Sequence, residues 1–218
     1  DLSPDNRSFR YGDGLFETMR VLNGNIALKN YHFERLLSGM KLLQFDIPDF
    51  FTASHLEEDI LSLCKKNRMV DAVIRLVVFR SDGGIYDLDD MRPNYIIQSI
   101  GLQKIARLKE QPEGIEIDIY DEVTKACNAF SAVKSNNFLP YTMGALFAKQ
   151  KKLGDCLILN QYGRIADATI SNVFIVKEEK IYTPPLSEGC VAGVSRRFLL
   201  EHLPLHGFNI QEKALTAE

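Results

Sequence analysis

The stretch "SAVKSNNFLPYTMGALFAKQ", residues 131–150, places Lys134 just ahead of an apolar-periodic run. Small or apolar residues precede the lysine, and a polar triplet follows it. An ammonium group is costly to remove from water unless it loses its charge or its amine is consumed in a bond. A lysine in a partly apolar pocket at a strand-to-helix junction therefore suits a nucleophile that later carries a proton. This segment alone favours the simpler interpretation, an exposed turn lysine.

The run after Lys134 predicts a helix over residues 137–152. Its apolar residues recur at helical spacing, and we expect these to face inward: Leu139, Met143, Leu146 and Phe147. "IEIDIYDEV" before the lysine alternates as a strand does, and "DCLILN" and "NVFIVKEEKIYTPP" predict further strands. "SRRFLLEHL" predicts a second helix. This half of the chain therefore mixes helices and strands.

The first half has the same mixture. Two extended runs flank Asn23-Gly24, the dipeptide most typical of a type I′ hairpin. "NYHFERLLSGMKLL", with Asn30 as its cap, and "FTASHLEEDILSLCKKN" predict amphipathic helices, whereas "DAVIRLVVFR" and "NYIIQSIG" predict strands. A polar segment with Pro and Gly follows. We predict an α+β protein with a small N-terminal domain (1–100), a linker (101–113) and a larger C-terminal domain (114–218).

Composition limits the function. The chain has 218 residues, is 45% hydrophobic and has a formal net charge of -3 with both signs interspersed. No broad field attracts nucleic acid or an anionic membrane, and no apolar run approaches the roughly 20 residues of a membrane span. The cysteines and histidines are scattered, which favours reduced thiols and argues against a metal site. We expect a cytoplasmic protein with no metal, nucleic-acid or membrane partner.

A second feature with chemical meaning is "TPPLSEGCVAGVSRRFLLEH", in which a Pro-Pro turn and two glycines lead into a helix. The N–H groups at Gly193, Val194 and Ser195, with the Ser195 hydroxyl, predict an anion-binding site at the positive end of the helix dipole. Taken alone, Ser195 is more typical of an N-cap. No Walker lysine follows, so the segment does not indicate nucleotide binding.

Three charged side chains add to this pattern. Asp167, in "GRIADATISNVFIV", has small and apolar neighbours. A buried carboxylate there needs a positively charged or donating partner, and the alternative is a surface turn. Arg35, in "YHFERLL", is typical of a solvated helix face. Arg75 interrupts the apolar strand "AVIRLVVF" and is harder to explain as a surface residue.

Taken together, these residues predict one ligand. Lys134 suits an aldehyde, Ser195 and Arg35 suit a phosphate, and Asp167 suits a ring nitrogen that is kept protonated. Pyridoxal phosphate carries all three of these groups. We therefore expect pyridoxal phosphate as the cofactor.

Five segments, in order, resemble the class IV aminotransferase family of fold-type IV pyridoxal phosphate enzymes. They are "FRYGDGLFETMRV", "HFERL", "VKSNNFL", "GRIADATISNVFIV" and "TPPLSEGCVAGVSRR", and the resemblance covers most of the chain. The family includes branched-chain and D-amino acid transaminases and 4-amino-4-deoxychorismate lyase. The resemblance implies a two-domain fold like that of D-amino acid aminotransferase, with the cofactor cleft between the domains. It also implies a homodimer that acts on a small amine or amino acid.

The resemblance implies roles for individual residues. Lys134 takes the place of the Schiff-base and proton-transfer lysine, and the phosphate contacts correspond to Arg35, Val194 and Ser195. Asp167 stands where the family normally has the glutamate that pairs with the pyridine nitrogen. Aspartate is one methylene shorter, so the ion pair must be closed by a backbone shift or a bridging water. The resemblance then implies a weaker electron sink.

On the substrate side, Tyr11 and Phe16 correspond to residues that line the pocket, and Arg75 to a position that faces substrate acid groups in some members. The family normally has an earlier strand and a later segment that supplies another phosphate and substrate contact. This chain lacks an initiator Met and stops at "QEKALTAE" without a closing strand or helix. We expect it to be incomplete at both ends.

The resemblance leaves several members of the family open. D-amino acid transaminases carry an arginine and a histidine two apart in the loop after the "VVFR" strand, whereas this loop reads "SDGGIYDLDD". Branched-chain enzymes often have a longer, glycine-rich segment after the lysine, where this chain has "KSNNFL". The compact form favours 4-amino-4-deoxychorismate lyase, which releases pyruvate and 4-aminobenzoate in folate biosynthesis. A branched-chain-type aminotransferase is the first alternative, and a non-catalytic protein that keeps the fold is the second.

Overall fold

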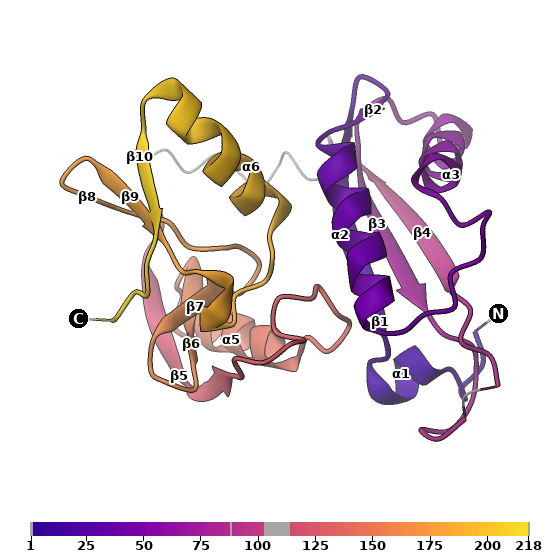
Figure 1. Cartoon of the computed structure of the whole chain (residues 1–218), viewed down its shortest axis with the longest axis horizontal. Helices are drawn as coiled ribbons and strands as arrows, with labels where there is room; N and C mark the ends of the chain where they lie inside the picture. The colour runs from indigo at the N-terminus through magenta and orange to yellow at the C-terminus, as the bar shows by residue number, and fades with distance from the viewer. Residues whose placement is uncertain (1, 88, 103–113, 218) are drawn as a thin grey trace. The chain divides into compact units, whose positions relative to one another are not determined.

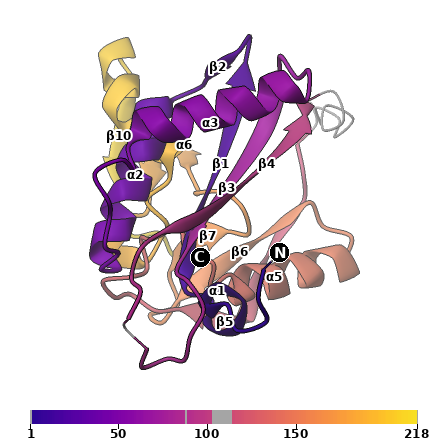
Figure 2. The ribbon, with the colours of Figure 1, turned by 90° about the vertical axis from the view of Figure 1, so that its right-hand side faces the viewer.

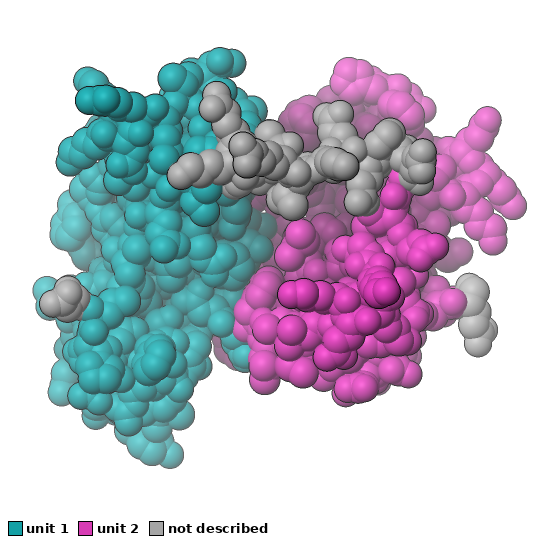
Figure 3. Space-filling view, turned by 180° about the vertical axis from the view of Figure 1, so that it is seen from behind, with its two compact units in different colours: residues 1–110, 134–137 teal, residues 111–133, 138–218 magenta. Residues whose placement is uncertain are grey.

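The computed structural model describes residues 2–87, 89–102 and 114–217. The chain forms two compact units, one built from residues 1–110 with 134–137 and the other from 111–133 with 138–218 (Figure 1, Figure 3). The predicted linker falls almost entirely outside the described residues. The short segment 134–137, which holds the predicted nucleophile, belongs to the first unit, although the chain on either side of it belongs to the second.

Helices and strands are mixed in both units, as predicted for an α+β protein. The first unit contains, in order, α1 (Arg7–Tyr11), β1 (Gly14–Leu22), β2 (Asn25–Ile26), α2 (Lys29–Leu42), α3 (Ala53–Lys66), β3 (Ala72–Phe79) and β4 (Asn94–Gly101). The described part of the second unit contains β5 (Ile117–Lys125), α5 (Leu139–Gln150), β6 (Asp155–Asn160), β7 (Ile165–Ala168), β8 (Ile175–Lys177), β9 (Lys180–Thr183), a 3₁₀ turn (Leu186–Glu188), α6 (Val194–His202), a second 3₁₀ turn (Leu203–His206) and β10 (Asn209–Glu212).

The strands of the first unit form an antiparallel sheet in the order β2-β1-β3-β4. The predicted hairpin between β1 and β2 is confirmed, since Asn23 and Gly24 both have positive φ (49° and 75°), as a type I′ turn requires. β1 then pairs with β3 over most of its length. Successive side chains of a strand point to opposite faces, so Phe16 and Glu17 lie on different faces of this sheet.

Helices α2 and α3 cover the Glu17 face of the sheet, and α3 runs across the strands in Figure 2. Apart from Glu17, the residues of β1 and β3 on that face are apolar, and Met19, Ile74 and Leu76 are at most 1% exposed. Leu36 and Met40 of α2 and Ile60 of α3 complete this core. Period-2 patterning in the strands and 3.6-residue patterning in the helices therefore bury the same apolar layer.

The predicted start of α2 was wrong. Asn30 is the second residue of the helix, and the N-cap is Leu28, whose φ of 53° is left-handed. The pairing of the hairpin continues as far as Ala27, whose N–H donates to the Arg20 carbonyl at 2.9 Å. One residue is then left to turn the chain into the helix, so no side chain caps it.

The opposite face of the sheet carries Phe16 and Arg75. Arg75 is exposed, although Ile74 and Leu76 on either side of it are fully buried. The sequence made Arg75 hard to explain as a surface residue, and the structure corrects this expectation. Helices cover one face of the sheet, and on the other face Arg75 is exposed while Val73 and Val77 are half-buried.

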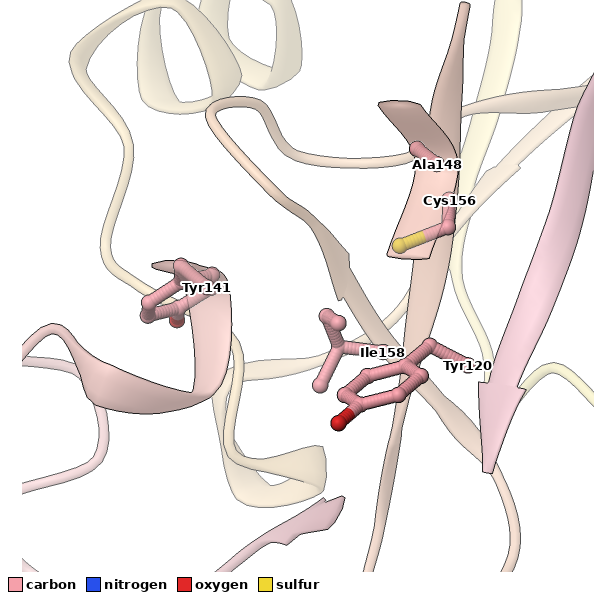
Figure 4. Packing of buried hydrophobic residues seen from close by; sticks show 5 residues of the cluster. All are labelled: Tyr120, Tyr141, Ala148, Cys156 and Ile158. Carbon is pink, nitrogen blue, oxygen red and sulfur yellow. The ribbon is translucent and has the colours of Figure 1, made fainter. Parts of the chain in front are cut away.

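Two small sheets form the second unit. β6 pairs in parallel with β5 and antiparallel with β7, and β9 pairs in parallel with β10 and antiparallel with β8. Helix α5 packs on β5 and β6. The core at this contact is shown in Figure 4 and consists of Tyr120, Tyr141, Ala148, Cys156 and Ile158.

Helix α5 presents a different face to the core from the one predicted. Three of the residues expected to face inward are exposed, at 66% for Leu139, 38% for Met143 and 47% for Leu146. Only Phe147 packs partly against the core. The buried residues of the helix are Tyr141, Gly144 and Ala148. A Cβ at Gly144 would lie 2.8 Å from Ile158 Cδ1, so α5 approaches β6 more closely than a larger side chain there would permit.

Candidate active site

Backbone pairing with β1 fixes the position of Lys134. The Phe16 N–H donates to the Lys134 carbonyl at 3.0 Å, and the Asn136 N–H donates to the Gly14 carbonyl at 2.9 Å. Gly14 permits this close approach, because a Cβ there would lie 2.5 Å from Asn136 Nδ2. The main chain of Lys134 is thus held beside the start of β1, in the first unit.

The aromatic ring of Phe16 contacts two cations. Lys134 Nζ lies 4.3 Å from the ring centroid, and Arg75 Cζ lies 4.1 Å from it. Phe16 is 4% exposed, Lys134 is half-buried and Arg75 is exposed. The face of an aromatic ring attracts cations within about 6 Å. The structure therefore brings together three predicted residues, and their two positive charges suit a carboxylate ligand.

Arg35 is paired with Glu17 on the helix-covered face of the sheet. Its Nε donates to Glu17 Oε1 at 2.7 Å and its Nη2 donates to Oε2 at 2.5 Å, while His32 Nδ1 lies 2.7 Å from Oε2. Burial alone would raise the pKa of Glu17, but the hydrogen bonds of His32 and Arg35 outweigh it, and the pKa lies below its usual value. Sequence reasoning missed Glu17. The sequence feature that could have identified it is an acidic residue at a strand position that alternation places on the buried face.

Tyr11 is the last residue of α1 and is 41% exposed. The guanidinium of Arg10 lies 5.3 Å from the centroid of its ring. A role for Tyr11 on the substrate side stays a prediction, and the same holds for Phe16 and Arg75.

Two arginines organise the loop that follows β3. Arg7 donates through Nε to Asp13 at 2.9 Å and through Nη1 to the carbonyls of Gly84 and Asp87. Arg80 also donates to Asp13 and is only 5% exposed. Both arginines therefore hold the main chain and Asp13 in place in this region, whereas Arg75 is exposed on the sheet.

Asp167 is buried on β7 of the second unit, with 2% of its surface exposed. Its Oδ2 accepts hydrogen bonds from Lys125 Nζ at 2.8 Å, the Tyr141 hydroxyl at 2.9 Å and the Val191 N–H at 3.1 Å. Its Oδ1 accepts from Asn172 Nδ2 at 3.0 Å. The cationic and donating partners that a buried carboxylate requires are both present.

Sequence reasoning identified neither Lys125 nor Tyr141. They are 8% and 7% exposed, and Lys125 Nζ also donates to the Tyr141 hydroxyl. Burial raises the pKa of Tyr141, and the charge of Asp167 raises it further. Lys125 was missed because the register between β5 and β6 shifts between Tyr120 and Thr124, which breaks the alternation that the sequence shows.

The start of α6 is built differently from the prediction. Gly193 is the N-cap, and no side chain caps the helix, so Ser195 is not the N-cap. Val194 is buried and Ser195 is exposed. The first N–H groups of a helix have no partner within the helix, and their dipoles favour an anion there. Their contact with phosphate stays a prediction.

Each unit, taken by itself, carries groups that suit one part of pyridoxal phosphate. In the first unit, the Lys134 amine suits the aldehyde. In the second unit, the start of α6 suits the phosphate and the Asp167 carboxylate suits the ring nitrogen. Asp167 Oδ1 accepts one hydrogen bond, and a carboxylate oxygen has about two lone-pair positions, so it can also accept from a protonated ring nitrogen. The resemblance assigns Arg35 to the phosphate, and the structure shows its bidentate contact with Glu17.

The described residues contain neither a candidate metal site nor a candidate membrane span. No group of three or more His, Cys, Asp or Glu side chains within residues 2–87, 89–102 and 114–217 could hold a metal ion. Across the same residues, no helix is both long and apolar enough to span a membrane. The four cysteines, all of them described, are present as thiols.

Known proteins resemble this chain over most of its length. Residues 14–218 match the model of the amino-transferase class IV family. The chain is 31% identical to the aminodeoxychorismate lyase of Bacillus subtilis, over 100% of this chain and 75% of the relative. It is 28% identical to a putative branched-chain-amino-acid aminotransferase of Methanocaldococcus jannaschii, over 94% and 70% of the two chains.

A solved structure shows the same fold. The branched-chain amino acid aminotransferase of Escherichia coli is similar with a TM-score of 0.89 and 23% identity, over 100% of this chain and 74% of that chain. The predicted fold-type IV architecture is thereby confirmed. The names of the relatives include a lyase and aminotransferases, so they define the family rather than one reaction. The chain belongs to the class IV aminotransferase family of pyridoxal phosphate-dependent enzymes.

Proposed function

We propose that this enzyme is a 4-amino-4-deoxychorismate lyase, which releases pyruvate and 4-aminobenzoate for folate biosynthesis. The observation that carries the proposal is the pair of cations on Phe16, with Lys134 Nζ 4.3 Å and Arg75 Cζ 4.1 Å from the ring centroid. The substrate of this lyase bears two carboxylates. An exposed guanidinium beside the nucleophilic amine suits one of them, because arginine binds carboxylates in a bidentate geometry.

The loop after β3 also supports a lyase. It reads "SDGGIYDLDD" and offers acids where a D-amino acid transaminase has an arginine and a histidine. Arg7 binds the main chain of this loop at Gly84 and Asp87, and its Nε is paired with Asp13. Because Arg7 is occupied in this way, we assign recognition of a substrate carboxylate to Arg75.

The proposed reaction is an elimination that consumes neither water nor an oxidant. A ring carbon of the substrate loses a proton, the C–O bond of the pyruvyl ether breaks, and the ring becomes aromatic. Pyridoxal phosphate supplies the electron sink for this carbanion chemistry. Lys134 Nζ removes the proton and returns it to the departing enolpyruvate. Arg75 orients the substrate so that the reacting carbon lies within reach of the amine.

A comparison of two substrate mixtures tests the proposal. Purified protein with pyridoxal phosphate receives 4-amino-4-deoxychorismate in one mixture, and a branched-chain amino acid with 2-oxoglutarate in the other. We expect equal amounts of pyruvate and 4-aminobenzoate from the first mixture and no glutamate from the second. Glutamate from the second, with no 4-aminobenzoate from the first, overturns the proposal in favour of a branched-chain-type aminotransferase, the activity in the name of the Methanocaldococcus jannaschii relative.

Variants of the two cations test their roles. Lys134→Ala should abolish turnover while the fold is kept. Arg75→Leu removes a charge-assisted hydrogen bond of about 1.5–3 kcal/mol, so we expect KM to rise roughly 10- to 100-fold with a smaller change in kcat. Arg20→Leu is the matched control, because Arg20 is also an exposed arginine of this sheet. An unchanged kcat/KM for Arg75→Leu would refute the assignment of the carboxylate.

The resemblance also leads us to propose that the enzyme acts as a homodimer on a small-molecule amine or amino acid. Light scattering of the purified protein at several concentrations measures its mass. A mass of two chains in the active preparation supports the dimer, and a fully active single chain contradicts it.

A further inference from the structure

A buried cluster in the second unit is not explained by the roles assigned so far. Lys125 of β5, Tyr141 of α5 and Asp167 of β7 are 8%, 7% and 2% exposed. Lys125 Nζ lies 2.8 Å from Asp167 Oδ2, and the Tyr141 hydroxyl lies 2.9 Å from the same oxygen. Replacing a buried ion pair by apolar residues of similar volume is often neutral or stabilising. Stability alone therefore does not account for this cluster.

The two oxygens of Asp167 are unequally occupied. Oδ2 accepts three hydrogen bonds, from Lys125, Tyr141 and the Val191 N–H. Oδ1 accepts one, from Asn172. A carboxylate oxygen has about two lone-pair positions, so Oδ2 is saturated and Oδ1 keeps the capacity to accept another donor. Lys125 and Tyr141 therefore orient the carboxylate and reserve one oxygen.

We propose that Lys125 and Tyr141 are positioning residues, which hold the Asp167 carboxylate in one orientation and leave Oδ1 to accept a hydrogen bond from the ring nitrogen of the cofactor. The inference rests on the pyridoxal phosphate chemistry of the proposed function. It gives a reason why an aspartate can replace the longer glutamate of the family. The anchored oxygen compensates for the shorter side chain by restricting the orientation of the carboxylate.

Lys125 supplies the charge in this cluster. Among the described residues, Lys125 and Tyr141 contact Asp167, and the Cys190 thiol lies close enough to be affected by its charge. Burial and then the charge of Asp167 raise the pKa of Tyr141, and they raise the pKa of Cys190 to about 11, so both groups are neutral between pH 6 and 8. Without Lys125, the carboxylate would be buried with neutral donors only. Burial without a cation favours the protonated form of an acid.

Carbon NMR of the cofactor-free protein tests whether Lys125 holds the Asp167 carboxylate. The carboxyl carbons of aspartate are labelled with ¹³C, and Asp167→Asn assigns the signal. We expect the chemical shift of the Asp167 carboxyl carbon at pH 7 to change in Lys125→Met, because the contact of Oδ2 with the Lys125 amine at 2.8 Å is lost. Lys151→Met is the matched control, since Lys151 is an exposed lysine paired with Asp118. Its spectrum should match the wild type, and a Lys125→Met signal that also matches it overturns the inference.

Cofactor affinity tests the role of the cluster toward the ring. Dissociation constants for pyridoxal phosphate are measured by absorbance at pH 7. The dissociation constant of Lys125→Met should exceed that of the wild type about tenfold, because Oδ2 is no longer held and Oδ1 is no longer oriented toward the ring nitrogen. Equal dissociation constants in the two folded proteins would assign Lys125 a purely structural role.

Two further variants extend the test. Lys125→Arg should restore the affinity of the wild type, because it keeps the cation. If Lys125→Met does not fold, Tyr141→Phe provides the test, since it removes one donor to Oδ2 and should weaken cofactor binding while Lys125 still contacts Asp167. Unchanged affinity in that variant contradicts the role of Tyr141. A folded wild type that binds no cofactor refutes the proposed function and the role toward the ring, while the ¹³C spectrum separately decides the role of Lys125 toward Asp167.

Discussion

Replacing Glu17 with glutamine removes the charge from a buried carboxylate held by two side chains of α2. Glu17 is 1% exposed, and Arg35 and His32 contact its two oxygens at 2.5 to 2.7 Å. Glutamine keeps the shape of the side chain but leaves Arg35 without its counter-ion. Breaking one side of a buried ion pair costs about 3–5 kcal/mol. Because the amide oxygen still accepts one hydrogen bond, we expect a loss of about 3 kcal/mol in the unfolding free energy of the first unit at pH 7.

The loss of unfolding free energy in Glu17→Gln should become smaller at acid pH. The pKa of Glu17 in the folded chain lies below the ordinary value of 4.5, because the hydrogen bonds of His32 and Arg35 outweigh burial, which would raise it. A carboxyl group whose pKa is lower in the folded chain than in the unfolded chain stabilises the fold. This stabilisation is complete above the pKa of the unfolded chain, and it is lost as the pH falls through the pKa of the folded chain. The difference in unfolding free energy between the wild type and Glu17→Gln should therefore become smaller below pH 4.5, the ordinary pKa of this group.

Hydrogen exchange with mass spectrometry measures this effect, because it reports the opening free energy of peptides from β1 and α2 separately from the second unit. Glu57→Gln is the matched control. Glu57 pairs with Lys29 at 2.9 Å, but both side chains are partly exposed, and such a pair contributes at most about 1 kcal/mol. A Glu17→Gln loss no larger than that of the control, or a difference that does not narrow in acid, would refute the reasoning.

Three further predictions concern the second unit. Gly144→Val should destabilise it by about 1–3 kcal/mol and lower its Tm, because a Cβ at this position would lie 2.8 Å from Ile158 Cδ1. Leu146→Glu should change stability by less than about 0.5 kcal/mol in denaturant titrations, because Leu146 is 47% exposed, and a large loss would show that this face is buried. Cys156 and Cys190 should resist a thiol reagent at pH 8 in the native protein, because burial first and then nearby acids raise the pKa of each thiol to about 11. Mass spectrometry of labelled peptides before and after unfolding checks this, and rapid native labelling would contradict it.

The sequence predicted where helices and strands lie better than which side of each element is buried. The Asn23-Gly24 hairpin was right because positive φ at two successive residues is a local requirement. A helix after Lys134 was also right, yet its inward face was wrong. The face depends on the neighbouring strand, which lies close to Gly144 and the other small or buried residues of α5. A periodicity of large apolar residues carries no information about a close approach that small residues permit.

The partners of buried charges are the part of the candidate site that the sequence did not predict. Desolvation alone requires a partner for a buried carboxylate, and this requirement was recognised for Asp167. The residue that meets it comes from a distant segment, since Lys125 lies 42 positions before Asp167. Glu17 and its partners on α2 lie 15 and 18 positions apart and were missed in the same way. The sequence identified Asp167 and Arg35 as candidate residues, but their contacts depend on how strands and helices pack.

The argument that a buried lysine needs a reason applies more strongly to Lys125 than to Lys134. Lys125 is 8% exposed and donates to Asp167 at 2.8 Å, whereas Lys134 is half-buried with its amine on the ring of Phe16. A carboxylate contact stabilises the charged form of an amine, and a charged amine is not a nucleophile. Burial alone would therefore have selected the lysine that is unsuited to bond formation. The resemblance, rather than burial, therefore selects Lys134 as the Schiff-base lysine.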